Sequence, residues 1–214
     1  MKRTGLMLSA LAAFVVLVSS CRKEPLNDMT AEESRIYVTN YDEKADFTTF
    51  KTFSIVDSVA VISNREGAKK ELTQYDQQLL AQLKSQMQAR GYTLVDKAAK
   101  PDLAMNVSRI DNTTTSIGYN PGYWAGWPGY WDTGYWGYPG WGYWFPSYYN
   151  VFRYNEKSVA VDLLDLKNAK TGEGNKLTAI WNVMLRGSGV WNGNNVESMV
   201  KAVFDQSQYL KTTN

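Results

Sequence analysis

A stretch of 35 residues, 116–150, carries over half of the aromatic side chains and limits what this chain can fold into. It contains six tryptophans, eight tyrosines, one phenylalanine, eight glycines and four prolines, but only one charged residue, Asp132. The unit Gly-Tyr-Trp occurs four times, starting at residues 122, 129, 134 and 142, and the unequal spacing excludes a solenoid repeat. Because glycine or proline recurs every three or four residues, the stretch is a poor helix and a poor strand. We expect a long loop inserted between two strands and separable from the fold.

Three interpretations of this aromatic insertion are open. In the first, the loop folds back on its own domain, and its rings stack on one another and on proline. In the second, it enters a membrane interface, where tryptophan and tyrosine are favoured. In the third, it binds sugars, because pyranose rings stack on indole and tyrosine hydroxyls bond sugar hydroxyls; base stacking is disfavoured because the insertion has no Lys or Arg. The candidate ligand or interface contacts are Tyr123, Trp124, Trp127, Tyr130, Trp131, Tyr135, Trp136, Trp141, Tyr143 and Trp144.

The N-terminus is typical of a bacterial lipoprotein precursor. Two basic residues precede an apolar run over 6–18, which is too short to span a bilayer, and two serines directly precede Cys21. We expect residues 1–20 to be a signal peptide and Cys21 to carry the lipid anchor; an ordinary signal peptide with an incidental cysteine is the alternative. Arg22-Lys23 resembles the sorting pattern of enterobacterial outer-membrane lipoproteins. We therefore expect a protein anchored to the outer membrane of the cell envelope, facing the periplasm.

Composition removes the commonest catalytic and metal sites. The chain has no histidine and one cysteine, which the anchor would use, so Ser–His triads, Cys–His dyads and histidine- or thiolate-based zinc sites are excluded. Without residues 1–20, 21 basic residues balance 21 acidic ones, which disfavours nucleic-acid binding. Asp162 and Asp165 lie an odd number of residues apart on one expected strand and so face opposite ways. We expect no catalytic residue, no cofactor and no metal site.

Hydrophobic periodicity predicts one α+β domain over 46–210, after a lipidated and flexible tether over 21–45. The expected elements are strands over 47–57, 92–95, 103–108, 159–166 and 177–186, a helix from Thr73 to Gly91 and a second helix whose capping box is Asn194 with Glu197. The first helix has its own capping box, Thr73 with Asp76. This order predicts an antiparallel-rich sheet of about five strands with two helices packed on one face.

Alternation along the expected strands separates a core face from a polar face. Leu103, Met105 and Val107 share one face of their strand, whereas Asn106 lies on the other. We expect Asp162 and Asp165 to lie on a solvated strand face or in a turn contact.

Several short motifs occur in order along this expected domain. They are Asp46-Phe47, Phe50-Lys51-Thr52-Phe53, Arg90-Gly91-Tyr92, Pro101-Asp102-Leu103, the strand over 159–166, Thr171-Gly172 and Trp181. In this order they resemble the small bacterial lipoproteins of the DUF4136 family, a domain of unknown function. The resemblance covers 46–210 and implies a compact α+β domain without an established activity. A longer loop over 167–176 and Asn182 in place of a basic residue depart from the family pattern.

These features predict a membrane-anchored envelope lipoprotein with a non-catalytic binding or structural role. One alternative is a glycan-binding module that holds peptidoglycan or lipopolysaccharide with the aromatic insertion; an envelope enzyme is the third. The expected partners are the membrane, through the N-terminal lipid, and an envelope glycan or another envelope protein.

Overall fold

The computed structural model describes residues 30, 32–63, 69–111, 117–119, 130–145, 152–154, 157–170 and 174–213. The expected signal peptide, Cys21, Tyr123, Trp124 and Trp127 lie outside these residues. Within the described part of the chain, no helix is long and apolar enough to cross a membrane.

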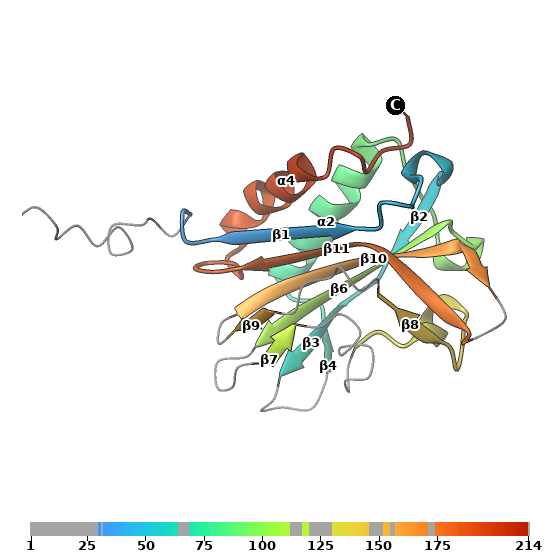
Figure 1. Cartoon of the computed structure of the whole chain (residues 1–214). Helices are drawn as coiled ribbons and strands as arrows, with labels where there is room; N and C mark the ends of the chain where they lie inside the picture. Colours follow the sequence, from blue (N-terminus) through green and yellow to red (C-terminus); the bar gives the residue numbers. More distant parts are fainter. Residues whose placement is uncertain are drawn as a thin grey trace, which may run out of the picture.

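A nine-stranded mixed sheet organises the chain (Figure 1). Its strands are β1 (Ile36–Tyr41), β2 (Thr52–Ile55), β3 (Val59–Ser63), β4 (Lys69–Glu71), β5 (Thr93–Leu94), β6 (Leu103–Asp111), β8 (Gly142–Trp144), β10 (Lys157–Lys170) and β11 (Lys176–Arg186). The order is β1-β11-β10-β6-β2-β5, with β3 also beside β6, β4 beside β3 and β8 beside β11. The predicted α+β class is confirmed. The five predicted strands correspond to β2, β5, β6, β10 and β11, and the sheet also contains β1, β3, β4 and β8. Of these, β4 and β8 have three residues each and are too short to show a periodicity.

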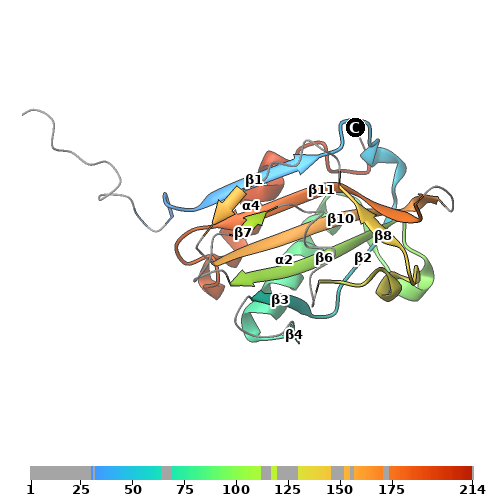
Figure 2. The ribbon, with the colours of Figure 1, turned by 60° about the horizontal axis from the view of Figure 1, so that its bottom comes forward.

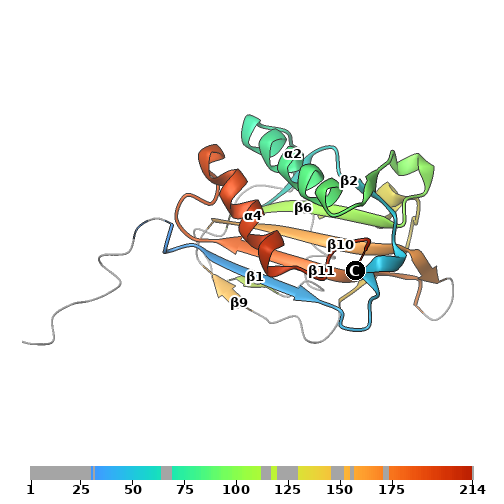
Figure 3. The same cartoon turned by 90° about the horizontal axis from the view of Figure 1, so that it is seen from above.

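Both helices, α2 (Gln74–Ala89) and α4 (Val196–Gln206), cover the same face of the sheet (Figure 3). The predicted capping box of α2 is present: the Thr73 side chain accepts from the Asp76 backbone N–H, and the Asp76 side chain accepts from the Thr73 backbone N–H. The predicted apolar stripe is buried and comprises Leu79, Leu80, Leu83 and Met87. Gly91 ends the helix with φ +90°, and a Cβ there would lie 2.2 Å from Thr212 Oγ1.

The start of α4 differs from the prediction. Its N-cap is Asn195, without a side-chain hydrogen bond, so Asn194 and Glu197 form no capping box. The reason is a preceding 3-10 turn, η4 (Gly193–Asn195), in which the Asn192 side chain accepts from the Asn194 N–H. The apolar face of α4 is buried as predicted and comprises Val196, Met199, Val200, Val203 and Phe204.

The expected strand over 47–57 is interrupted. Phe47–Thr49 form a 3-10 turn, η1, because the Asp46 side chain accepts from the Thr48 N–H. The chain then forms β2 and, after a bend at 57–58, β3. Both strands pair in parallel with β6, and α2 lies on the crossover between β2 and β6.

The expected tether contains an ordered edge strand. Residues 36–41 form β1 and pair with β11 in antiparallel register, from Ile36 opposite Arg186 to Tyr41 opposite Trp181. The charges of 21–45 suggested flexibility, but Ile, Tyr, Val and Thr dominate this short piece and favour a half-buried strand.

The second face of the sheet is covered by residues 130–145 of the aromatic insertion, which we call the aromatic cover. Figure 2 views the sheet from this side, with the helices behind it. Tyr130, Trp131 and Trp136 are buried in the core. The expectation of a loop separable from the fold is wrong for this part, because the helices cover only one face and the other also needs a packing layer. The insertion also contains β8 and the short strand β7 (Ile117–Tyr119). Strand β7 pairs in antiparallel register with β9 (Phe152–Tyr154), which follows the insertion.

Candidate functional site

Three polar side chains lie in register across the central strands, beneath the aromatic cover. Asn106 of β6, Asp162 of β10 and Asn182 of β11 are direct cross-strand neighbours. Asn106 and Asn182 are 0% exposed and Asp162 is 3% exposed. The expectation of a solvated strand face is therefore wrong at Asp162, because the cover lies over it.

The aromatic cover supplies hydrogen bonds that this buried row needs. Tyr130 OH donates to Asp162 Oδ2 at 2.6 Å, and Asn182 Nδ2 donates to Asp162 Oδ1. Trp136 Nε1 donates to Asn106 Oδ1 at 2.9 Å. Burial raises the pKa of the Asp162 carboxyl to about 6, although the hydrogen bonds from Tyr130 and Asn182 oppose the shift. These contacts make the row part of the packing between sheet and cover.

Trp131 completes the hydrogen bonding at the edge of β6. Strand β2 pairs with residues 103–105 and β3 with residues 108–111, so Val107 lies between the two pairings. The Trp131 indole Nε1 donates to the Val107 carbonyl at 3.0 Å. Lys70 Nζ lies 4.2 Å from the centroid of the same indole, a cation–π distance. Trp131 is therefore a structural residue in this fold.

Two adjacent aromatic side chains of β8 point to opposite sides of the strand. Tyr143 points inward, where its OH donates to the Trp131 carbonyl at 2.8 Å. Trp144 points the other way and is 44% exposed. Because β8 pairs in parallel with β11, Trp144 lies opposite Thr178, and Thr178 lies opposite Asp165 of β10. Trp144, Thr178 and Asp165 thus form a second row across three strands.

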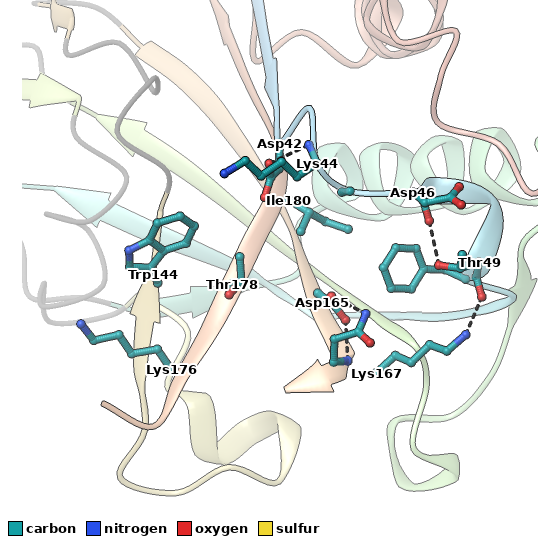
Figure 4. A pocket seen from close by; sticks show the side chains of 13 residues that line it. Asp42, Lys44, Asp46, Thr49, Trp144, Asp165, Lys167, Lys176, Thr178 and Ile180 are labelled. Carbon is teal, nitrogen blue, oxygen red and sulfur yellow. Dashed lines mark hydrogen bonds between the residues drawn. The ribbon is translucent and has the colours of Figure 1, made fainter. Parts of the chain in front are cut away.

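This second row lines an open groove of about 820 Å³, which we call the Trp144 groove (Figure 4). The connection from β1 to β2 lines it as well, through residues between Asp42 and Phe50. In Figure 4, Trp144 and Lys176 lie on one side, and Asp46 and Thr49 on the other.

The polar groups of the Trp144 groove are held in place. Asn168 donates to Asp165 through its backbone N–H and through Nδ2, each at 2.8 Å. Burial raises the pKa of Asp165, and the bonds from Asn168 oppose that shift. Lys167 Nζ donates to the Thr49 carbonyl at 2.6 Å. An exposed indole beside fixed hydrogen-bonding groups suits a ligand with one apolar face and a polar rim.

Comparison with known proteins places this fold in a family. A family model described as a domain of unknown function, DUF4136, matches residues 37–207. The chain belongs to the DUF4136 family. The match begins before the predicted start of the domain, residue 46, and thereby includes β1.

A crystal structure of a DUF4136 protein from Bacteroides thetaiotaomicron is similar to this chain, with 34% sequence identity and a TM-score of 0.71. The alignment covers 84% of this chain and 99% of that one. The PelC dodecamer from Paraburkholderia phytofirmans matches with 9% identity, the same coverages and a TM-score of 0.42. A search of curated proteins found no match.

The predicted ligand contacts that the structure describes fall into two groups. Tyr130, Trp131 and Trp136 are buried, and Tyr135, Trp141 and Tyr143 are partly buried against the core. Among the candidates that the structure describes, Trp144 lines the groove. Sequence reasoning missed Thr178 and the wall over 42–50, because neither carries a motif. Alternation within residues 142–144 was the available signal, since it places Tyr143 and Trp144 on opposite faces.

The two aspartates of β10 lie in different surroundings. Asp162 contacts the aromatic cover, whereas Asp165 lines the Trp144 groove, in keeping with their odd spacing. Among the described residues there is no group of three or more His, Cys, Asp or Glu that could hold a metal ion.

Proposed function

We propose that this DUF4136 protein is a lipid-anchored protein of the cell envelope whose Trp144 groove binds a glycan without catalysing a reaction. The observation that carries the binding role is the row of Trp144, Thr178 and Asp165 across adjacent strands. A sugar ring has an apolar face of C–H groups and a rim of hydroxyls. The exposed indole suits the face. The hydroxyl and carboxylate, spaced by strands about 5 Å apart, suit the rim.

The polar surroundings of Asp165 support binding over catalysis. Both of its carboxylate oxygens accept hydrogen bonds from Asn168. Such a carboxylate is a fixed acceptor for ligand hydroxyls, because Asn168 holds both of its oxygens in place. We therefore expect peptidoglycan to be recovered uncleaved after incubation with the protein, and release of soluble fragments would contradict the non-catalytic role.

The groove is tested by titrating the mature full-length protein, in detergent, with soluble peptidoglycan fragments and with lipopolysaccharide. Trp144→Ala should weaken binding of the true ligand by about tenfold, the equivalent of about 1.4 kcal/mol. Leu72→Ala is the matched control, because it removes another exposed apolar side chain, 49% exposed, which does not line the groove. Binding that is unchanged by Trp144→Ala would contradict the proposal.

The membrane interface is the competing ligand for an exposed tryptophan. The same titration with lipid vesicles separates the two, because insertion shifts tryptophan emission to shorter wavelength. We expect no Trp144-dependent shift, since three aspartates and three lysines line the groove around Trp144 and insertion would remove these charges from water.

The anchor is tested at Cys21. Thiolate chemistry forms the thioether to lipid, so Cys21→Ser should leave an unlipidated precursor. Mass spectrometry of the mature wild-type protein should show an acylated N-terminal cysteine, and fractionation should place it in the outer membrane. An unmodified mature N-terminus at another residue would contradict the anchoring.

A further inference from the structure

A second pocket, of about 600 Å³, opens beside the Trp144 groove, and Lys167 lines both. It lies between the turn before β6 and the aromatic cover. We call it the lysine pocket; its polar and aromatic lining includes Lys97, Lys100, Asp102, Trp136, Tyr138 and Lys167. Because Lys167 is common to both, one extended ligand that follows the end of β10 can reach from one to the other.

The lysine pocket has an excess of positive charge. Its lining has three lysines and one aspartate, Asp102. The Asp102 carboxylate already accepts the backbone N–H groups of Lys51 at 2.6 Å and Thr52 at 3.1 Å. Asp102 therefore serves the backbone at the start of β2 rather than the lysines of the pocket.

The lysines are held at separate points of the pocket. Lys97 Nζ lies 3.6 Å from the centroid of the Tyr135 ring, and Lys167 Nζ is bonded to the Thr49 carbonyl. Lys100 has a left-handed backbone, with φ +54°, at the end of the 3-10 turn η2 (Lys97–Ala99). Tyr135 does not line the pocket and Thr49 lines the Trp144 groove, so the ammonium groups of Lys97 and Lys167 lie at two different margins of the pocket.

The backbone N–H groups of three residues that line the lysine pocket already donate to backbone carbonyls. The N–H of Gly137 donates to the Gly134 carbonyl, that of Tyr138 to the Thr133 carbonyl, and that of Lys167 to the Asp102 carbonyl. A phosphate group is typically cradled by several free backbone N–H groups, which these residues do not supply. Spaced ammonium groups suit carboxylates that recur along a polymer.

We infer that the lysine pocket binds carboxylate groups of a sugar polymer, so that the glycan held by the Trp144 groove is a carboxylated, acidic one. The inference rests on the proposed function for its assumption that the groove holds a glycan. It adds a second subsite and a substrate class: one sugar ring stacks on Trp144, and carboxylates on neighbouring rings contact Lys167, Lys97 and Lys100. Because these charges lie at the surface, added salt should weaken the binding.

The test compares oligogalacturonate with its methyl ester, which has the same sugar backbone without the charges. The mature full-length protein should bind the acid form about tenfold more tightly than the ester. The double variant Lys97→Gln with Lys100→Gln should remove most of this preference and leave binding of the ester unchanged. The matched control, Lys84→Gln with Lys201→Gln, removes two lysines of the helices, which do not line the pocket, and should keep the preference.

Equal affinity for both forms, with both reduced by Trp144→Ala, would overturn the acidic-glycan inference and leave the proposed function standing. If the protein bound neither oligogalacturonate nor its methyl ester, the acidic-glycan inference and the proposed glycan binding would both be overturned for this class of polymer. A preference lost equally in the control variant would overturn the assignment to this pocket. The single variant Lys100→Gln, at an exposed turn, tests the same assignment if the double variant does not fold; an unchanged preference there would count against it.

Discussion

The two faces of the central sheet are covered by different kinds of structure. On one face, α2 and α4 pack apolar stripes with helical periodicity against the strands. On the other, the aromatic cover packs tryptophan and tyrosine rings and supplies hydrogen bonds to a buried polar row. The helix face depends on apolar burial. The covered face depends in addition on pairing each buried polar group, which makes the cover part of the fold and places Trp144 at its outer edge.

The largest effect is expected from removing the aromatic cover. Replacing residues 130–145 with a short Gly-Ser linker would expose the part of β6 that Trp131 covers. It would also leave Asn106 and Asp162 without the hydrogen-bond partners that the cover supplies. We expect loss of a cooperative thermal transition, measured by circular dichroism. A variant that keeps a cooperative transition near the wild-type midpoint would show that the cover is an appendage after all.

Single large-to-small substitutions on the two faces come next. Trp131→Ala should lower the free energy of unfolding by about 3–5 kcal/mol, because it removes a buried indole and its bond to Val107. On the helix face, Leu83→Ala should cost about 2–5 kcal/mol. Urea unfolding measures both. An unchanged midpoint for Trp131→Ala would mean that the cover contributes little packing.

The buried acid gives the covered face a pH dependence of its own. The pKa of Asp162 is raised from 3.8 to about 6 in the folded protein, so the folded state holds this proton more tightly than the unfolded state. Its stabilising contribution is therefore full below about pH 4 and is lost as the pH rises through 6, a change of about 3 kcal/mol.

Asp162→Asn should abolish that contribution. The difference in unfolding free energy between wild type and variant, measured from pH 4 to pH 7.5, isolates it, because the other acids are common to both proteins. Asp205→Asn is the control, since Asp205 is an exposed acid on α4. A difference that stays flat across this range would show that Asp162 titrates as it does in the unfolded chain.

Local rules predicted most of the helix face, although the expected capping box of α4 is absent. The capping box at Thr73 and the spacing of Leu79, Leu80 and Leu83 depend on residues within one or two turns of each other, so the sequence contains them directly. The end of α2 at Gly91 follows in the same way from its backbone conformation.

The covered face could not be predicted in this way. Glycine and proline in the insertion only disfavour long regular elements. Nothing local shows that Tyr130 meets Asp162, 32 residues further along the chain. Asp162 appeared to belong to a solvated face, because alternation identifies two faces without saying what covers the second. The Trp144 groove depends on the same long-range register, since Thr178 and Asp165 meet Trp144 only through strand pairing.

The smallest effect on stability is expected where the cover ends, at two adjacent residues of β8. Tyr143→Phe removes a hydroxyl that donates to the Trp131 carbonyl and accepts from Asn106 Nδ2, so it should lower the free energy of unfolding by about 1–2 kcal/mol. Trp144→Ala removes an exposed side chain and should change that free energy by less than about 0.5 kcal/mol. Glycan binding should follow the opposite order, with Trp144→Ala causing the loss and Tyr143→Phe retaining most of the affinity. Urea unfolding and titration of the same two preparations measure both quantities. If Trp144→Ala destabilised the protein as much as Tyr143→Phe, Trp144 would belong to the packed cover, and the groove would lose the residue that distinguishes it from the rest of that face.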